Sequence, residues 1–561
     1  MNRRMGTRLL AAHLVAALML PAVLSACGGS KEQPGVVGTV HGFIGGAVAD
    51  EPRAAQVARD VLSAGGTAAD AAVALYFTLA VTLPSTASLG GGGVCVVYDG
   101  KANRGQVLDF APRAPAGGGP VALPSAVRGM FALYAQYGKL RWEQLVSPAE
   151  DLARFGTPVS RAFAADLLAA QPKLAADPEL AKIYLKPDGT PYKEGDRLVQ
   201  SDLSTMLSAI RSRGAGEFYM GPMAREFIRG AQAHGATMTL DDLRATPVGW
   251  RPAVIVKSDG TSIYFPSPPA VAGILEAQMW SMAAPRWKEA SVNERPHLFA
   301  QAELRAWLDR QRWLAGDFKV NPPPPELIDK SRIRALMASY QPGARTLPPG
   351  LQARSPGPDD AAASSFVVVD RNGSAVSCTL TPYDLFGAGH VATGTGVVLA
   401  ASPDEARGRG PQWLGPMIAV RDFSSGLSFL TEYHGGTARE GKEGESAGAQ
   451  FVFGGAASGG AAASSALIQV ALHTLIEGRP LDEASDAQRL HVEAEPADTV
   501  FVETGVQPRP PGLVERGYNI VPVPVIGRVN AIFCLDGAID RPQSCAFRAD
   551  RRGFGLAAGG F

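Results

Sequence analysis

The chain has 561 residues, 46% of them hydrophobic, and its 53 lysine and arginine residues balance 53 aspartate and glutamate residues. This length suits either several domains or one large layered core, so it does not fix the number of domains. Because the formal net charge is zero, the chain has no excess positive field to attract a polyphosphate backbone, which argues against nucleic acid as a partner.

Residues 1–26 have the pattern of a signal peptide. Arg3, Arg4 and Arg8 precede an apolar run, 9–23, that is too short to predict a membrane-spanning helix. The four residues LSAC, ending at Cys27, resemble the bacterial lipobox, which implies cleavage before Cys27 and acylation of its thiol. We therefore expect an exported protein with a lipid anchor on the periplasmic side of the bacterial cell envelope. Ordinary secretion, with Cys27 incidental, is the alternative.

Export places the other four cysteines in an oxidising compartment. Cys534 and Cys545 are close in sequence across a loop and can form a local disulfide. Cys95 and Cys378 lie in apolar, strand-like runs, which predict buried small hydrophobic side chains. No cysteine pair has the spacing of a zinc site, and no two of the eight histidines are four residues apart. The sequence therefore predicts no metal site and no cofactor.

The first predicted elements of the mature chain are two packed helices within residues 50–82. A glycine pair, 65–66, separates them, and Thr67 can cap the second helix with Asp70 in its first turn. Four glycines, 90–93, then precede a predicted strand, Val94 to Tyr98, and indicate close backbone approach either to another strand or to a ligand. Residues 120–250 alternate helical patches with short loops, so we expect this region to be mostly helical.

The second half of the chain begins after the best linker candidate, the Pro-rich segment 342–362. Phe366 to Val369 form an apolar, β-branched run, residues 370–373 supply turn chemistry, and the apolar pattern returns from Ala375 to Leu380. This pattern predicts a β-hairpin. A glycine-rich strand and helix, 451–477, and a series of short strands follow.

In this order and spacing, the chain resembles the γ-glutamyltranspeptidase family of N-terminal-nucleophile hydrolases. The segments that carry the resemblance are GAVADEPRAAQVARDVLSAGGTAADAAVAL, LGGGGVCVVYDG, EFYMGPMAREFIRGAQAHGATMTLDDL, SPPAVAGI, FVVVDRNGSAVSCTLT and ADRRGFGLAAGGF. The resemblance implies an α+β fold, a four-layer αββα sandwich in which two stacked antiparallel sheets lie between helical layers. It also implies a large-subunit-like region, 27–341, and a small-subunit-like region, 363–561, that form one interlaced unit.

The same resemblance implies the chemistry of the site. In such enzymes one threonine cuts the chain before itself, and its hydroxyl then attacks a γ-glutamyl carbonyl. Ungapped alignment on residues 368–370 places this nucleophile at Ala363, whose methyl group can do neither. The threonine that hydrogen-bonds the nucleophile matches Thr381, and the glycines whose amides form the oxyanion hole match Gly459 and Gly460.

The substrate-binding positions of the family differ in this chain. The arginine that binds the substrate carboxylate falls at Ala111, the paired serines fall at Gln412 and Trp413, and the acidic residue that holds the substrate amine falls at Glu405. Arg113, two residues beyond Ala111, can offer its guanidinium in place of the missing one.

We therefore expect an exported family member with a degenerate active site that lacks γ-glutamyl transfer and hydrolysis, the reactions of glutathione metabolism. It would be retained as a binding or envelope-associated protein, with a small γ-glutamyl or amino-acid-like ligand. One alternative is an active, divergent transferase or amidohydrolase that uses Ser364 as nucleophile, although one step along a strand turns a side chain to the other face. The other is a structural envelope protein without a small-molecule site.

Overall fold

The computed structural model of the chain describes most of residues 42–560. The described residues are 42–346, 362–404, 408–423, 448–492, 498–504 and 510–560. The predictions for the signal peptide, for Cys27, for Glu405 and for most of the Pro-rich linker therefore lie outside them. Within the described ranges, no helix combines the length and the apolar character needed to cross a lipid bilayer.

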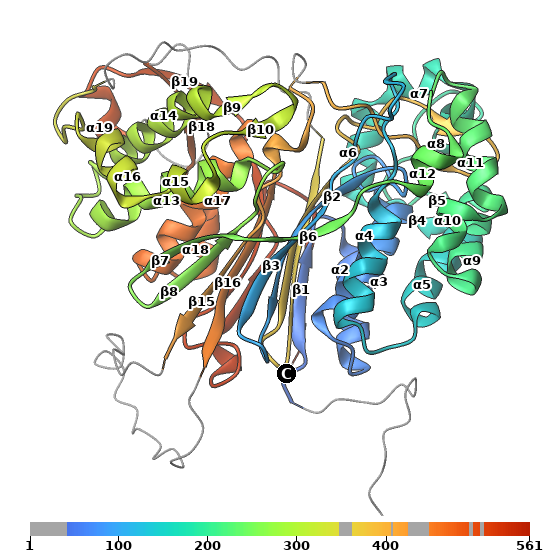
Figure 1. Ribbon diagram of the computed structural model, residues 1–561, viewed down its shortest axis with the longest axis horizontal. Coiled ribbons are helices and arrows are strands. Elements are labelled where there is room, and N and C mark those ends of the chain that lie inside the picture. Colours follow the sequence, from blue (N-terminus) through green and yellow to red (C-terminus); the bar gives the residue numbers. More distant parts are fainter. Residues whose placement is uncertain are drawn as a thin grey trace, which may run out of the picture. The chain divides into compact units, whose positions relative to one another are not determined.

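A seven-stranded antiparallel sheet contains the predicted hairpin at its centre (Figure 1). The prediction is confirmed: Gly373 lies in the turn with φ +72°, and Val368 is opposite Val376. Three of its six neighbouring strand pairs join a strand from before residue 341 to one from after residue 363. In spatial order the strands are β22 (Leu556–Gly560), β1 (Gly45–Ala49), β11 (Ser364–Asp370), β12 (Ala375–Thr381), β2 (Gly92–Asp99), β3 (Arg104–Phe110) and β6 (Gly249–Pro252).

A second antiparallel sheet has six strands. Its central strand pair includes the long glycine-rich strand that the sequence predicts near residue 451. In spatial order the strands are β21 (Cys545–Arg548), β20 (Arg528–Cys534), β16 (Ala449–Ser458), β15 (Met417–Asp422), β8 (Thr261–Phe265) and β7 (Val254–Ser258).

The two sheets pack against each other through β-branched and aromatic side chains. Val96 and Val367 of the first sheet share one buried cluster with Phe451 and Ile532 of the second. Successive side chains of a strand point to opposite faces. Odd-numbered residues of β11, including Val367, therefore face the second sheet, whereas Phe366 belongs to the cluster on the other face.

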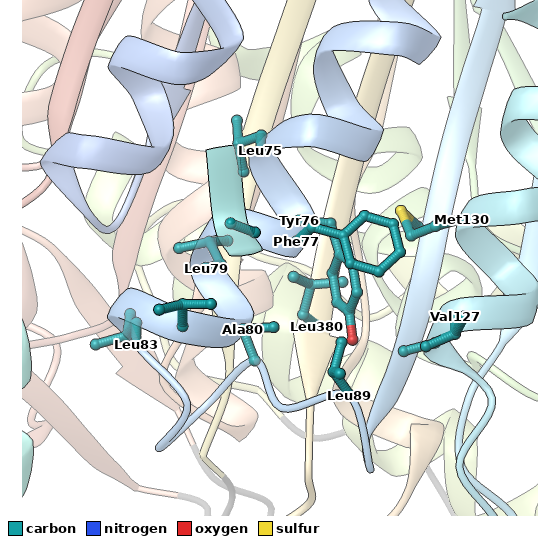
Figure 2. Close-up of a cluster of buried hydrophobic side chains, with 14 of the residues drawn as sticks. Leu75, Tyr76, Phe77, Leu79, Ala80, Leu83, Leu89, Val127, Met130 and Leu380 are labelled. Atoms are coloured by element: carbon teal, nitrogen blue, oxygen red, sulfur yellow. The ribbon is translucent and has the colours of Figure 1, made fainter. Parts of the chain in front are cut away.

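Helices cover the face of the first sheet that points away from the second. The two predicted helices are confirmed as α2 (Pro52–Ser63) and α3 (Ala68–Thr82). Thr67 caps α3, because its hydroxyl oxygen accepts from the Asp70 amide while the Asp70 carboxylate accepts from the Thr67 amide. In Figure 2, side chains of α3 such as Phe77 lie beside Leu380 of β12 and Met130 of the next helix, all within one core cluster.

The mostly helical character of residues 120–250 is also confirmed. The helices of this region are α4 (Ala126–Tyr137), α5 (Trp142–Phe155), α6 (Arg161–Ala169), α7 (Gln171–Ala176), α8 (Pro178–Tyr184), α9 (Ser201–Arg213), α10 (Gly216–Met220), α11 (Pro222–Gln232) and α12 (Leu240–Arg244). One short strand pair, β4 (Thr157–Pro158) with β5 (Arg197–Leu198), lies between helices of this region.

A second group of helices shares a core cluster with the outward face of the six-stranded sheet. They are α13 (Ala272–Trp287), α14 (Arg295–Trp313), α16 (Lys330–Met337) and α17 (Ala461–Ala471). A smaller sheet of β17 (Leu490–Val492), β18 (Thr499–Glu503) and β19 (Asn519–Val523) packs with them. The described chain therefore belongs to the α+β class, with helices on the outer side of each antiparallel sheet.

The first two glycines of β2 approach neighbouring strands, which is one of the two alternatives that the sequence left open. A Cβ on Gly92 would overlap the carbonyl oxygen of Phe110, and a Cβ on Gly93 would overlap that of Thr379. These glycines are needed for contact between neighbouring strands of one sheet.

Both cysteine pairs form disulfides. The Cys534–Cys545 bond joins the paired strands β20 and β21, as the sequence allowed. The prediction that Cys95 and Cys378 are separate buried thiols was wrong: both are fully buried, but they are bonded to each other. They are directly opposite on the adjacent strands β2 and β12, a pairing between residues 283 positions apart that sequence spacing alone could not reveal.

Candidate active site

The position expected to carry the nucleophile lies at the edge of the central hairpin. Ser364 pairs with Leu380, and one further step of the same register sets Ala363 opposite Thr381. The Thr381 hydroxyl donates a hydrogen bond of 2.6 Å to the carbonyl oxygen of Ala362. Thr381 is thus held against the peptide bond between Ala362 and Ala363, the bond that self-cleavage would break. The side chain at 363 is a methyl group, so no hydroxyl is available there to attack it.

A glycine turn between β16 and α17 faces the same place. Gly459 has φ +125° and Gly460 has φ +58°, conformations that favour glycine. A Cβ on Gly459 would also come within 2.9 Å of the Gly527 Cα atom. Neither amide bonds to another group within the described ranges. Two such amides at the N-terminus of an eleven-residue helix can stabilise a negatively charged oxygen.

The cavity enclosed by these elements is small. Its volume is about 10 Å³, which leaves room for about one water molecule. The lining residues come from the hairpin, the glycine turn and the segment after residue 408. They are Ala363, Thr381, Tyr383, Gly410, Trp413, Leu414, Ala457, Ser458, Gly459, Gly460 and Ala463. The structure therefore brings Thr381, Gly459 and Gly460 together around Ala363.

Ser458 is a cavity residue that the sequence reasoning missed. It ends β16 on the same face as Ala456, which belongs to the cluster between the sheets. Its side chain is fully buried, and its hydroxyl has no hydrogen-bond partner among the described residues. Without the register of β16, a serine before two glycines indicates only a turn, so no local pattern singles it out.

Ser364 and Ser365 point in opposite directions. Ser364 lies on the face of β11 that carries Phe366, toward the helices, and is absent from the cavity lining. Its buried hydroxyl has no partner within the described ranges. Ser365 faces the second sheet, where its hydroxyl accepts a hydrogen bond of 2.9 Å from the Asn530 amide group and its backbone N–H donates one of 2.8 Å to Asp50.

The arginine near the expected carboxylate-binding position is already paired. Arg113 contacts Asp109 at 2.7 Å, and Arg251 contacts the same carboxylate oxygen at 2.9 Å. Ala111 is buried and its amide donates to the other Asp109 oxygen at 3.3 Å. The structure does not bring Arg113 into the lining of the cavity, so a substrate carboxylate would have to compete with Asp109 for the guanidinium.

The two positions at which the resemblance predicts paired serines carry large side chains in a short 3-10 helix, Pro411–Trp413. The Trp413 indole lines the cavity and donates to the Gly408 carbonyl at 2.6 Å, while its ring packs against Trp307 with centroids 5.6 Å apart. The Gln412 side chain also donates to the Gly408 carbonyl, at 3.2 Å. Trp413 thus fills space that two serines would leave open.

Tyr383 is a second cavity residue that the sequence reasoning did not identify. Its phenol donates a 2.7 Å hydrogen bond to the Pro112 carbonyl, and its backbone has φ +71°. Burial raises the pKa of Tyr383, so the phenol stays neutral at physiological pH. Its amide donates to Thr381 Oγ1 at 2.7 Å, which fixes the threonine in place.

The comparison with protein families decides the assignment. The model of the family described as Gamma-glutamyltranspeptidase matches residues 54–408, more than half of the chain. The chain belongs to this family. The resemblance inferred from the hairpin and the glycine segments is therefore confirmed.

Named relatives in the γ-glutamyltranspeptidase family agree. Glutathione hydrolase proenzyme of Pseudomonas aeruginosa is 30% identical over 495 residues, which cover 82% of this chain and 85% of the relative. The protein of the same name from Escherichia coli is 28% identical over 518 residues, which cover 85% of this chain and 86% of the relative.

Solved structures agree as well. Cephalosporin acylase from Bacillus halodurans superposes with a TM-score of 0.74 at 20% identity, covering 94% of this chain and 98% of the acylase, and this likeness shows the fold alone. γ-Glutamyltranspeptidase of Helicobacter pylori superposes with a TM-score of 0.51 at 28% identity, over 56% of this chain and 97% of that chain.

Proposed function

We propose that this member of the γ-glutamyltranspeptidase family has lost γ-glutamyl transfer and hydrolysis and keeps the scaffold as an exported, lipid-anchored protein of the bacterial cell envelope. One observation carries the proposal: the methyl group of Ala363 stands where Thr381 and the glycine amides converge. In subtilisin, a protease that depends on a single serine hydroxyl, removal of that nucleophile lowers the rate by about 10⁶.

The substrate-binding side supports the same conclusion. Arg113 is held by Asp109, and Trp413 occupies one wall of a cavity with room for about one water molecule. A γ-glutamyl or amino-acid-like ligand is larger than this volume, so it could bind there only if lining side chains moved. The small volume therefore favours, as a second candidate, a structural envelope protein without a small-molecule site.

The alternative that uses Ser364 as nucleophile has less support. Its side chain and that of Ala363 leave the strand on opposite faces, and the glycine amides lie on the Ala363 side. Ser364 would have to rotate through the start of β11 to reach them, which would break its pairing with Leu380.

Two further features support the finer parts of the proposal. The disulfides suit an oxidising compartment, as export requires. Three separate core clusters, one between the sheets and one on each outer face, suit a four-layer αββα arrangement.

The primary experiment is a reducing, denaturing gel of the protein expressed with its signal peptide. We expect one long chain and no release of glutamate from a chromogenic γ-glutamyl anilide. Two fragments, with the smaller beginning at Ser364, would overturn the proposal in favour of the active alternative. Metabolic labelling with an alkyne fatty acid tests the anchor, since Cys27→Ser should abolish the label.

A thermal-shift screen separates the two non-enzymatic candidates. A ligand that binds the native state raises its melting temperature by mass action. A shift with glutamyl peptides or amino acids would support a binding role, and the absence of any shift would support the structural one.

A further inference from the structure

Three potential metal ligands from distant parts of the chain meet away from the candidate active site. Asp177 is the N-cap of α8, His234 follows α11, and His390 directly precedes β13 (Val391–Ala392). One ligand atom from each side chain lies within 4.8 Å of the other two. None of the three residues lines the cavity around Ala363.

The two imidazoles face the same carboxylate oxygen. His390 Nδ1 lies 2.7 Å from Asp177 Oδ2, and His234 Nδ1 lies 3.6 Å from it. The rings are stacked, with centroids 4.5 Å apart and planes 21° from parallel. Stacking therefore turns both Nδ1 atoms toward one point beside the carboxylate.

Hydrogen bonding alone explains only half of this arrangement. His390 at 2.7 Å makes an ordinary hydrogen bond to Asp177, but 3.6 Å is too long for one from His234. The Nδ1 atom of His234 thus points at an oxygen to which it is not bonded. A metal ion between the three atoms would use all of them.

The surroundings orient the three side chains as ligands. The Leu180 amide donates to Asp177 Oδ1 at 2.8 Å, which leaves Oδ2 for the cluster. His234 Nε2 lies 3.4 Å from the Thr393 hydroxyl, and histidine ligands commonly donate their second N–H to such a partner. The Asp177 side chain is 3% exposed, whereas those of His234 and His390 are 17% and 38% exposed. An ion from solution can therefore reach an oriented carboxylate.

We propose that Asp177, His234 and His390 bind a divalent transition-metal ion, for which Zn²⁺ is the best probe. Two imidazoles and one carboxylate are a donor set that Zn²⁺ accepts, with water completing the coordination. Ligand atoms about 2.0–2.1 Å from a tetrahedral zinc lie about 3.3 Å from one another. The distances of 2.7 and 3.6 Å from the carboxylate oxygen to the two nitrogens lie on either side of that value.

The ion would join the two halves of the chain. Asp177 and His234 belong to the large-subunit-like region, whereas His390 lies in the segment that leads from β12 past Tyr383. Binding would fix that segment against α8 and α11, and would do so whether or not the chain has catalytic activity. This site therefore stands apart from the proposed loss of the nucleophile.

The test uses the full mature chain freed of any polyhistidine tag. Equilibrium dialysis against Zn²⁺ followed by metal analysis gives the stoichiometry, and competition with a chromophoric chelator gives the Kd. We expect one ion per chain. Mutation of a residue that only orients a metal ligand typically weakens metal affinity by about 10–100-fold. Removal of a ligand itself, in His234→Ala or His390→Ala, should cost more, so we expect binding to weaken by about 100-fold or more.

Two variants sharpen this result. Asp177→Asn keeps an oxygen that can cap α8 but removes the anionic ligand, so it should fold normally and still bind Zn²⁺ more weakly. His473→Ala is the matched control, because His473 contacts a single carboxylate, Glu477, at 3.2 Å, and its loss should leave the affinity unchanged.

Visible absorption of the Co²⁺ form gives a second readout that does not depend on stability. A d–d spectrum present in the unmodified chain and absent from His390→Ala would support the proposal. The proposal would be overturned if the unmodified chain failed to bind one ion. It would also be overturned if His234→Ala and His390→Ala bound the ion as tightly as the unmodified chain does.

Discussion

The two halves of the cavity around Ala363 differ in how they are built. One half is made by backbone, namely the glycine turn at Gly459 and Gly460 and the register that sets Thr381 opposite residue 363. The other half depends on individual side chains, and there the structure has Ala363 and Trp413 at positions where the family resemblance implies hydroxyl groups.

The difference follows from what each half contributes to the fold. A change at Gly459 would force a Cβ against Gly527, so folding itself preserves the turn. The methyl group of Ala363 needs no hydrogen-bond partner, so the fold does not require a hydroxyl at this residue. Under the proposed loss of activity, the chemistry carried by side chains would disappear while the backbone geometry persists.

Restoring the missing hydroxyl should have the largest effect. In Ala363→Thr, the new hydroxyl would lie beside Thr381 and the glycine amides. We therefore expect a fraction of the Ala363→Thr molecules to be cleaved before residue 363, whereas the unmodified protein should give no detectable fragments. A reducing gel and N-terminal sequencing of the smaller fragment would measure it.

Ala363→Val is the matched control, since valine has the shape of threonine without the oxygen. If both variants stay intact, the backbone half has also lost its function, and the contrast between the two halves fails.

A change in the backbone half should affect stability instead. Gly459→Ala places a side chain at φ +125° and close to Gly527, so we expect a loss of about 1–3 kcal/mol, measured by urea denaturation. Gly249→Ala is the control, because a Cβ there meets no atom within 4 Å. Equal losses in the two variants would show that the fold does not constrain the glycine turn.

A buried carboxyl behind the glycine turn should make stability depend on pH. Burial raises the pKa of Glu276, which accepts a 2.9 Å hydrogen bond from the Ser464 hydroxyl of α17 and whose other oxygen has no partner among the described residues. An ordinary glutamate ionises near pH 4.5. The unfolded chain therefore loses this proton at a lower pH than the folded chain does. Native stability falls as the pH rises from about 4.5 toward the raised pKa of Glu276 in the folded chain.

Glu276→Gln, which imitates the protonated form, should raise the Tm at pH 8 and leave it nearly unchanged at pH 4. Calorimetry at the two pH values measures the difference. An equal effect at both pH values would mean that the pKa of Glu276 is the same in the folded and the unfolded chain.

The smallest effect should come from the serine beside the nucleophile position. Ser364→Ala removes a buried hydroxyl without a partner in the described structure, so we expect stability to change by no more than about 1 kcal/mol. Ser365→Ala is the comparison, because it breaks the contact with Asn530 and should be the more destabilising of the two. A larger effect at Ser364 would indicate a role that its orientation does not suggest.

Local patterns in the sequence were enough to predict the hairpin and the two N-terminal helices, whereas the placing of Thr381, Gly459 and Gly460 at one site came from the family resemblance. Strand alternation and helix capping depend on a few neighbouring residues, and the family resemblance supplied the order of the elements along the chain. Neither could predict which distant segments pair with one another. The Cys95–Cys378 bond depends on the register of β2 with β12, and the orientation of Ser458 depends on the register of β16 with its neighbours.

The Cys95–Cys378 bond also has a consequence for evolution of the chain. Cys95 precedes the peptide bond between Ala362 and Ala363 and Cys378 follows it, so the bond closes a loop across that peptide between residues 283 positions apart. If the chain were cut after residue 362, this disulfide would still link the two fragments covalently. A gain of cleavage at this peptide bond would therefore leave the two pieces covalently joined.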